Sequence, residues 1–322
     1  MSAVGHSSRS WPAPLVLAAA RVLLTLRHPL MTARFLRRLG YLPNPALPRT
    51  YNERLLWRKM LDRNPLFVTL TDKIAVKTYI RERCPELAHA ATLWVGDRPA
   101  DIPQALLDGE VMVKTNNGSG TNLVVRRGVP DRGRVEKRTR RWLRPRHGRR
   151  REEWAYWPIQ PKLLIEELLK LGSPELPTDI KVHVCGGVVA HVWAADRRDE
   201  RSLLLDGDGL PLPGRDSVYA GAFPPSEVLK VMVREAAGMA SVLAGDLDYI
   251  RVDFLATIDG LLAGEITVYP AAGYDTWSDP EIARRIERLW DLRLSEFMRR
   301  PQSGLTGLYA EALRSAAPGL LS

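Results

Sequence analysis

Two short apolar runs, 250–257 and 261–269, place the strongest constraint on how this chain folds. They are joined at 258–260 by an Asp-Gly turn, and an Asp-Gly pair between two apolar runs is a strong hairpin signal. Each run carries one acid near its middle, Asp253 in the first and Glu265 in the second. A carboxylate is costly to bury in an apolar strand unless its charge is compensated. The sequence therefore predicts a β-hairpin with two acids that need a partner.

These two carboxylates predict a divalent metal site. Acids on adjacent strands repel each other, and a cation between them removes that repulsion. Ligands that are all oxygen favour Mg²⁺ or Mn²⁺ over zinc. Arg251 precedes Asp253 by two residues, so both side chains point to the same face of the strand. That face suits a phosphate and its metal. The alternative is a half-solvated hairpin whose outer face simply carries Arg, Asp and Glu.

The composition is that of a globular protein with an unevenly placed charge. The chain has 322 residues, 45% of them hydrophobic and 26% charged, enough for two or three packed subdomains. The net charge is +10, and residues 126–151 contain thirteen Lys or Arg against two acids, a local +11 that leaves −1 for the remainder. Trp142 is the only aromatic residue of this segment, which disfavours nucleic-acid binding. The basic segment 126–151 therefore either binds an anionic substrate or is a solvated loop.

Two features bear on cellular location. Cys84 and Cys185 are the only cysteines and form no disulfide framework, which favours the cytoplasm. Residues 1–13 are predicted to be a disordered tail, and 14–39 an amphipathic helix. Arg21 interrupts its apolar stretch, which is too short to span a membrane. The helix is either an ordinary packing helix or an interfacial one, peripheral to the inner face of the membrane.

Lysines and a Gly-rich turn mark the first half of the chain. Residues 51–83 show helical periodicity, and Lys73 and Lys77 are expected on one face of a helix capped by Thr71 or Asp72. The strand 111–114 ends at a lysine, runs into a loop rich in Gly, Ser and Asn, and continues as a second strand. Such a loop lays backbone N–H groups over a phosphate, although a plain turn has the same composition.

The second half adds a strand, a hairpin and two helices. A strand centred on 163–165 is predicted, followed by the hairpin 179–185 and 188–194 and a loop over 203–214. His183 shares a strand face with Lys181, and a structural sheet histidine is favoured over a catalytic base. Ser226 is expected to cap a helix at 227–244, and Asp279-Pro280 to begin another.

The order of these features resembles the ATP-grasp fold, and in detail the TupA-like ATP-grasp family of teichuronopeptide and capsular polysaccharide biosynthesis. The matching stretches are 72–79, 113–120, 161–168, 178–183, 251–254 and 264–270. The resemblance implies an α+β fold in which two α+β subdomains clamp a nucleotide, with a helical N-terminal extension. The implied domains are 1–50 (tail and amphipathic helix), 51–110 (helical pre-grasp region), 111–170 (small subdomain with an Arg-rich lid, 126–151), 171–300 (large subdomain with the metal site) and 301–322 (C-terminal tail).

The resemblance also implies roles for individual residues. Nucleotide binding is expected of Lys73, Lys114, Asn117, Gly118, Ser119, Gly120, Lys162, Glu166, Glu167 and Leu169. The expected catalytic cations are Arg251, Lys181 and Lys162. Asp253, Glu265 and Thr267 are expected to hold Mg²⁺, with two ions implied and Mn²⁺ as an alternative. Thr267 departs from the family pattern, because an Asn commonly stands there and a hydroxyl is a poorer ligand.

The implied reaction is ATP-dependent ligation of a carboxylate to an amine through an acyl phosphate, which makes ATP and Mg²⁺ the expected cofactors. The expected acceptor is an anionic small molecule or glycan carboxylate, such as a sugar acid or polysaccharide precursor, and the partner an amino acid or amine. Two alternatives remain, a phosphotransferase or glycosyltransferase-type enzyme, and a degenerate ATP-grasp binding module. The sequence predicts no oligomeric state.

Overall fold

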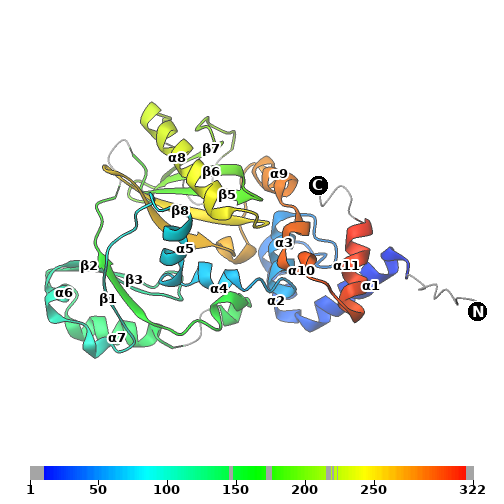
Figure 1. Cartoon of the computed structure of the whole chain (residues 1–322), viewed down its shortest axis with the longest axis horizontal. Helices are drawn as coiled ribbons and strands as arrows, with labels where there is room; N and C mark the ends of the chain where they lie inside the picture. The colour runs from blue at the N-terminus through cyan, green and yellow to red at the C-terminus, as the bar shows by residue number, and fades with distance from the viewer. Residues whose placement is uncertain are drawn as a thin grey trace, which may run out of the picture.

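Two antiparallel β-sheets and a bundle of helices make up the chain (Figure 1). The computed structural model describes residues 11–144, 148–171, 176–214, 219, 221–222 and 224–316. The first ten residues of the predicted tail and the end of the C-terminal tail, 317–322, lie outside these ranges. Short 3-10 helices are η1 (Pro99–Asp101), η2 (Arg149–Arg151), η3 (Trp154–Tyr156), η4 (Pro270–Gly273) and η5 (Leu292–Leu294).

The large sheet has the strand order β7-β6-β5-β8-β9. Its strands are β5 (Asp179–Cys185), β6 (Val188–Asp196), β7 (Arg201–Leu205), β8 (Ile250–Thr257) and β9 (Gly260–Thr267). Alternation sends Val182 and Phe254 to one face, where they pack with α8 (Glu227–Ala244) in a common core. Ser226 caps α8 by accepting a hydrogen bond from the Leu229 N–H at 3.1 Å, as predicted. The opposite face carries the polar residues of β5 and β8.

The predicted loop over 203–214 is wrong at its start. Residues 201–205 form the edge strand β7, which pairs with β6. Leu204 and Leu205 are 2% and 0% exposed, so burial in the sheet edge decides their conformation. A run of three leucines next to turn residues gave no alternation from which a strand could be predicted.

A β-bulge in the hairpin of β8 and β9 decides which acids meet. The register pairs Asp253 with Glu265 and then Phe254 with Ala263, so Gly264 is the extra residue. Without the bulge, Gly264 would pair with Asp253, and Glu265 would lie opposite Val252, on the apolar face. Because side chains alternate along a strand, a one-residue shift moves the whole following segment to the other face. The bulge therefore puts Glu265 beside Asp253.

The small sheet has the order β1-β4-β2-β3. Its strands are β1 (Thr92–Gly96), β2 (Glu110–Thr115), β3 (Asn122–Arg126) and β4 (Leu163–Glu167). Val113 and Ile165 face α6 (Gln104–Asp108) and α7 (Arg132–Trp142), and Val135 of α7 is fully buried among them. Lys114 and Glu166 point to the other face. Helix α7 thus packs on the outside of the small sheet, and a lid formed by the segment 126–151 stays a prediction.

Helices α4 (Leu66–Thr71) and α5 (Ala75–Arg83) lie between the two sheets (Figure 1). The helix predicted with Thr71 or Asp72 as its cap begins later, at Ala75, because a break in the helical structure at 72–74 separates α4 from α5. Asp72 Oδ1 accepts a hydrogen bond from the Ile74 N–H at 2.9 Å and so bridges the break. Lys73 therefore stands in the break, and it does not share a helical face with Lys77.

The helical bundle gathers the two ends of the described chain. Its helices are α1 (Ala13–Arg27), α2 (Pro29–Leu39), α3 (Tyr51–Met60), α9 (Pro280–Leu289), α10 (Glu296–Arg299) and α11 (Gly304–Ala316). The predicted single helix 14–39 is wrong, because α1 and α2 meet at 95°. Pro29 lacks an N–H and disfavours helical backbone at His28, whose φ is −127°. No single helix of the described chain is long and apolar enough to cross a membrane.

Candidate active site

Three charged side chains of the large sheet stand in one row on its open face. Lys181 of β5 pairs in register with Asp253 of β8, which pairs with Glu265 of β9. Arg251 donates from Nε to Asp253 Oδ1 at 2.6 Å and from Nη2 to Oδ2 at 2.7 Å, a bidentate ion pair. Burial raises the pKa of Asp253, and the charge of Arg251 opposes that shift. Arg251 and Asp253 therefore neutralise each other inside the sheet.

Glu265 is the carboxylate that the surrounding cations share. Its oxygens lie 4.0 Å from Lys73 Nζ and 4.0 Å from Arg251 Nη2, and its side chain is 43% exposed. Desolvation raises the pKa of Glu265, but Lys73, Arg251, Lys181 and Lys114 outweigh it and hold the pKa below its usual value. Glu265 thus stays ionised, and none of its cations lies at the close distance of the Arg251–Asp253 pair.

Glu166 of β4 in the small sheet holds two lysines, Lys114 of β2 and Lys77 of α5. Lys114 Nζ donates to Glu166 Oε2 at 2.6 Å, and Lys77 Nζ forms an ion pair with Glu166 Oε1. Lys77 also donates to the carbonyl of Ala90 at 2.9 Å. Desolvation raises the pKa of Glu166, yet the two lysines outweigh it and lower the pKa. The carboxylate of Glu166, a predicted nucleotide-binding residue, is therefore engaged by lysines.

The Gly-rich turn between β2 and β3 lies against Lys73. Lys73 Nζ donates to the carbonyl of Gly118, and its N–H donates to the carbonyl of Asn116 at 2.9 Å. A Cβ at Gly118 would lie 2.4 Å from Thr121 Oγ1 and 2.7 Å from Thr115 Oγ1, so a larger residue would have to displace these threonine side chains. Asn117 is buried, whereas Ser119 and Gly120 are exposed at the tip of the turn. The predicted loop and Lys73 are thereby brought together.

Lys181 has an aromatic neighbour in place of a close acid. Its Nζ lies 3.9 Å from the centroid of the Trp193 ring, a cation–π contact. Burial lowers the pKa of Lys181, and the charge of Asp253 opposes this. His183, on the same face, is buried, and its Nδ1 lies 2.8 Å from the hydroxyl of Tyr249. This partner favours the structural interpretation of His183.

Three predicted residues make no hydrogen bond or ion pair with this group of charges in the described part of the chain: Lys162, Glu167 and Leu169. The side chain of Lys162 is exposed, and that of Leu169 is half-buried. Glu167 accepts a hydrogen bond from the Ala91 N–H at 2.8 Å. Thr267 lies beside Glu265, with its Oγ1 3.4 Å from Oε1.

Sequence reasoning missed Asn116 and Gly264. Asn116 fastens the turn to its neighbours, because its Nδ2 donates to Asp72 Oδ1 at 3.2 Å and to the carbonyl of Gln160 at 3.1 Å. Its Oδ1 accepts from the Lys162 N–H at 2.8 Å. Two successive asparagines at a strand end signalled only a turn. The signal for the bulge was Gly264 itself, since a glycine inside a strand often marks one.

Five cations and three carboxylates meet at this site. The cations are Lys73, Lys77, Lys114, Lys181 and Arg251, and the acids are Glu166, Asp253 and Glu265. They come from both sheets, from α5 and from the break between α4 and α5. This surplus of positive charge, with a Gly-rich turn beside it, suits a phosphate-bearing ligand.

Two facing sheets with this charged site between them define an ATP-grasp protein. A family model described as TupA-like ATPgrasp matches residues 53–287, more than half of the chain, so the protein belongs to the TupA-like ATP-grasp family. The predicted family and α+β ATP-grasp fold are confirmed. The comparison with curated proteins gave no match.

Three solved structures illustrate the likeness. The D-alanine–D-alanine ligase from Bacillus anthracis complexed with ATP is 14% identical, with a TM-score of 0.36 over 62% of this chain and 53% of that one. The RimK domain ATP-grasp protein from Sphaerobacter thermophilus DSM 20745 is 12% identical, with a TM-score of 0.42 over 81% and 77%. The ADP complex of PurK, N5-carboxyaminoimidazole ribonucleotide synthetase, is 12% identical, with a TM-score of 0.41 over 82% and 58%. The chain thus spans about half the length of the first of these ligases.

Proposed function

We propose that this protein joins a carboxylate to an amine in an ATP- and Mg²⁺-dependent reaction that forms an amide. The observation that carries the proposal is the meeting of Lys73, Lys114 and Lys181 around Glu265, because these lysines come from three different parts of the fold. Negative charge gathers on the phosphoryl oxygens during transfer, and cations fixed in advance lower that barrier. The domain limits predicted from the sequence are part of this proposal.

The donor chemistry fits a magnesium ion. Asp253 and Glu265 are register partners, and with the Thr267 hydroxyl they offer only oxygen ligands. Among the described residues, no group of three His, Cys, Asp or Glu side chains could hold a metal by itself. We propose that Asp253 and Glu265 hold the ion together with phosphate oxygens of the nucleotide. When bound, the metal neutralises charge on those oxygens.

The proposed reaction has two steps. An oxygen of the acceptor carboxylate attacks the γ-phosphorus, the bond from that phosphorus to the bridging oxygen breaks, and ADP leaves. The amine nitrogen then attacks the acyl carbon, phosphate leaves, and the nitrogen loses a proton. Lys181 and Arg251 would face the acyl phosphate, and Lys73, Lys114 and the turn 117–120 would hold the triphosphate. The exposed Lys162 is proposed to join them when nucleotide is bound.

The acceptor is proposed to be a sugar acid or a polyanionic polysaccharide precursor. Helix α7 supports this because Lys137, Arg138 and Arg141 are exposed on its surface. Within the described residues these three side chains form no ion pair, whereas Arg140 pairs with Glu136 at 2.9 Å. Cations that have no ion-pair partner in the described chain attract an anionic polymer over a distance of about a Debye length.

A thermal-shift titration tests the nucleotide site first. A ligand that binds only the folded state at ~100 times its Kd adds about 2.7 kcal/mol to the free energy of unfolding. We expect ATP with Mg²⁺ to raise Tm, and ATP with EDTA to raise it less. Acids and amines are then screened for ADP release, with mass spectrometry of the amide. A phosphorylated or glycosylated acceptor would indicate the alternative transferase, and no Tm shift a binding module.

Glu265→Gln is the variant that isolates the metal site. The side chain is 43% exposed and has no ion pair closer than 4.0 Å, so the change preserves the fold. Asp259→Asn is the matched control, an exposed acid on the turn of the same hairpin. We expect Glu265→Gln to abolish turnover and the Mg²⁺-dependent part of the Tm shift, and Asp259→Asn to change neither. Full activity in Glu265→Gln would refute the metal assignment.

A further inference from the structure

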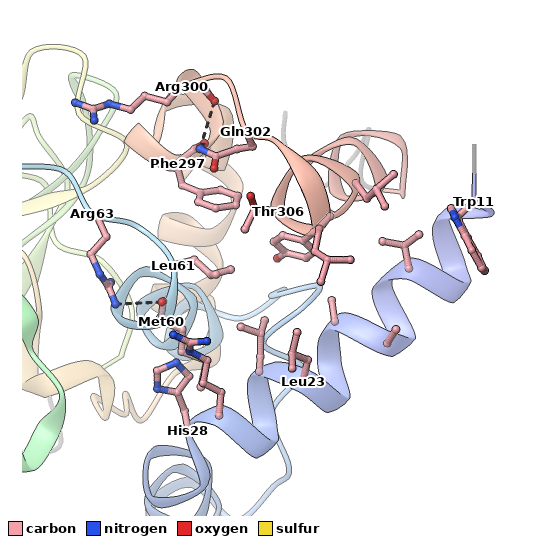
Figure 2. Close-up of a pocket in the computed structure, with 18 of the residues that line it drawn as sticks. Trp11, Leu23, His28, Met60, Leu61, Arg63, Phe297, Arg300, Gln302 and Thr306 are labelled. Atoms are coloured by element: carbon pink, nitrogen blue, oxygen red, sulfur yellow. Dashed lines mark hydrogen bonds between the residues drawn. The ribbon is translucent and has the colours of Figure 1, made fainter. Parts of the chain in front are cut away.

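A cavity lies in the helical bundle and shares no lining residue with the charged site. It has a volume of about 1040 Å³ and opens between α1, the end of α3 and the start of α11 (Figure 2). This volume is at the upper end of ligand pockets, which range over roughly 300–1,000 Å³. The ligase proposal gives this cavity no role, and the inference drawn from it is independent of that proposal.

The wall of the cavity is an aliphatic stripe. Leu15, Ala19 and Leu23 recur every four residues along α1 and therefore point to the same side, and Leu305 and Leu308 of α11 face them. Leu15, Leu23 and Leu305 are 60%, 55% and 75% exposed. A single exposed leucine is ordinary in a folded protein, but several converging on one cavity indicate an apolar ligand.

Arginines give the cavity a positive charge. Its lining includes Arg27, Arg63 and Arg300, against one acid, Glu296, which pairs with Arg300. Arg27 ends α1 and makes no ion pair within the described chain. Among the described residues, Arg63 donates hydrogen bonds only to carbonyls, those of Lys59 at 2.9 Å, Asp62 at 3.1 Å and Met60 at 3.2 Å. Its guanidinium carbon also lies 5.2 Å from the centroid of the Trp154 ring.

Arg27 and Arg63 are neighbours of like charge. Burial lowers the pKa of Arg63, Tyr269 and Asp62 oppose this shift, and the charge of Arg27 adds to it. Figure 2 shows Arg63 and His28 at one end of the cavity and Trp11 at the far end of α1. An anion between the two guanidiniums would remove their repulsion, and arginine is the residue best suited to phosphate. The cavity is therefore apolar along its length and cationic at one end.

We propose that this cavity binds a phosphate-headed amphiphile, with its hydrocarbon chain along α1 and its phosphate at Arg27 and Arg63. The charge at one end favours this ligand over a neutral lipid, and the aliphatic stripe favours it over free phosphate. Leu26 and Leu30 are exposed on the outer side of the bent pair, at 71% and 73%, and do not line the cavity. They belong to a different surface, and the test below distinguishes binding there from binding in the cavity.

The test is calorimetric titration of the full chain with dodecyl phosphate below its critical micelle concentration. Parallel titrations use dodecyl glucoside, which is neutral, and inorganic phosphate. We expect saturable 1:1 binding of dodecyl phosphate, weaker binding of the glucoside and none of phosphate. Leu23→Gln should weaken binding of dodecyl phosphate about tenfold, because a polar group then faces the chain. Arg27→Gln should weaken binding of dodecyl phosphate and leave binding of dodecyl glucoside unchanged.

Val22→Gln is the matched control, since Val22 is 59% exposed on the same helix and does not line the cavity. Its binding should equal that of the unchanged protein. Equal losses in Val22→Gln and Leu23→Gln would assign binding to the outer face of α1 and overturn the proposal. If only a variant ending at Ala316 binds dodecyl phosphate, the natural occupant of the cavity is the segment 317–322. If the protein is a dimer that Leu23→Gln dissociates, the occupant is a second copy of the chain. Either result overturns it.

Discussion

The bulge at Gly264 makes a prediction about both stability and function. A Cβ at this position would lie 2.7 Å from the backbone oxygen of Asp253, closer than real contacts. Because the neighbour is backbone in a paired strand, it moves only by shifting β8 or β9. Gly264→Ala therefore strains the pairing that sets Asp253 opposite Glu265.

Two opposing contributions set the expected change in the free energy of unfolding of Gly264→Ala. Overpacking a tight site costs about 1–3 kcal/mol. Replacing glycine by alanine restricts the unfolded chain and returns about 0.4–1 kcal/mol. We therefore expect Gly264→Ala to lower the free energy of unfolding by about 1–2 kcal/mol.

Gly238→Ala is the matched control with the opposite expected sign. Gly238 lies within α8, and a Cβ there would meet no atom within 4 Å. Alanine in a helix interior is favoured over glycine by roughly 0.5–1 kcal/mol, so this variant should be more stable than the unchanged protein.

Urea unfolding followed by fluorescence measures both variants, and the Mg·ATP thermal shift measures the site. In Gly264→Ala, Mg·ATP should raise Tm much less than in the unchanged protein. In Gly238→Ala, Mg·ATP should raise Tm by the full amount. If Gly264→Ala is as stable as the unchanged protein and keeps the full shift, the bulge does not position Glu265.

Two further predictions concern buried groups. Arg58 and Asp248 form an ion pair at 2.8 Å with 0% and 2% exposure, so Arg58→Met should cost about 3–5 kcal/mol in urea unfolding. A cost under 1 kcal/mol would mean that the pair is accessible to water. Burial lowers the pKa of His191 to about 3 from 6.5. The unfolded chain then binds more protons between pH 3 and 6.5, so stability falls as the pH falls through this window. His191→Phe should flatten that slope, and equal slopes would refute the assignment.

Local sequence signals predicted the elements that begin or end at a characteristic turn or cap residue. The Asp-Gly turn gave the hairpin of β8 and β9, and Ser226 gave the start of α8, because turn and cap chemistry acts within a few residues. The shared face of Arg251 and Asp253 followed from alternation alone. These features depend on neighbours in the sequence, and they were predicted correctly.

Register and tertiary packing were beyond these signals. Whether Glu265 lies opposite Asp253 depends on one extra residue in β9, and the alternation of apolar and polar residues does not reveal that residue. Lys73 and Lys77 fit a helical spacing, but Asp72 bonds to the Ile74 N–H and the chain breaks between them. Asp72 was predicted as a cap, yet the sequence did not show that Lys73 would be left outside the helix and turned toward Gly118.

The ion pairs also indicate where a phosphate should bind. Glu166 holds Lys77 and Lys114, and Asp253 holds Arg251, so these cations are compensated before any ligand arrives. Lys181 forms no ion pair within 4.0 Å among the described residues, and Lys73 has only Glu265 at that distance. A ligand gains most from charges that it need not separate from a partner. We therefore expect the phosphoryl group nearest the metal to lie between Lys73 and Lys181, above Glu265, and Lys114 to contact the nucleotide only after its bond to Glu166 opens.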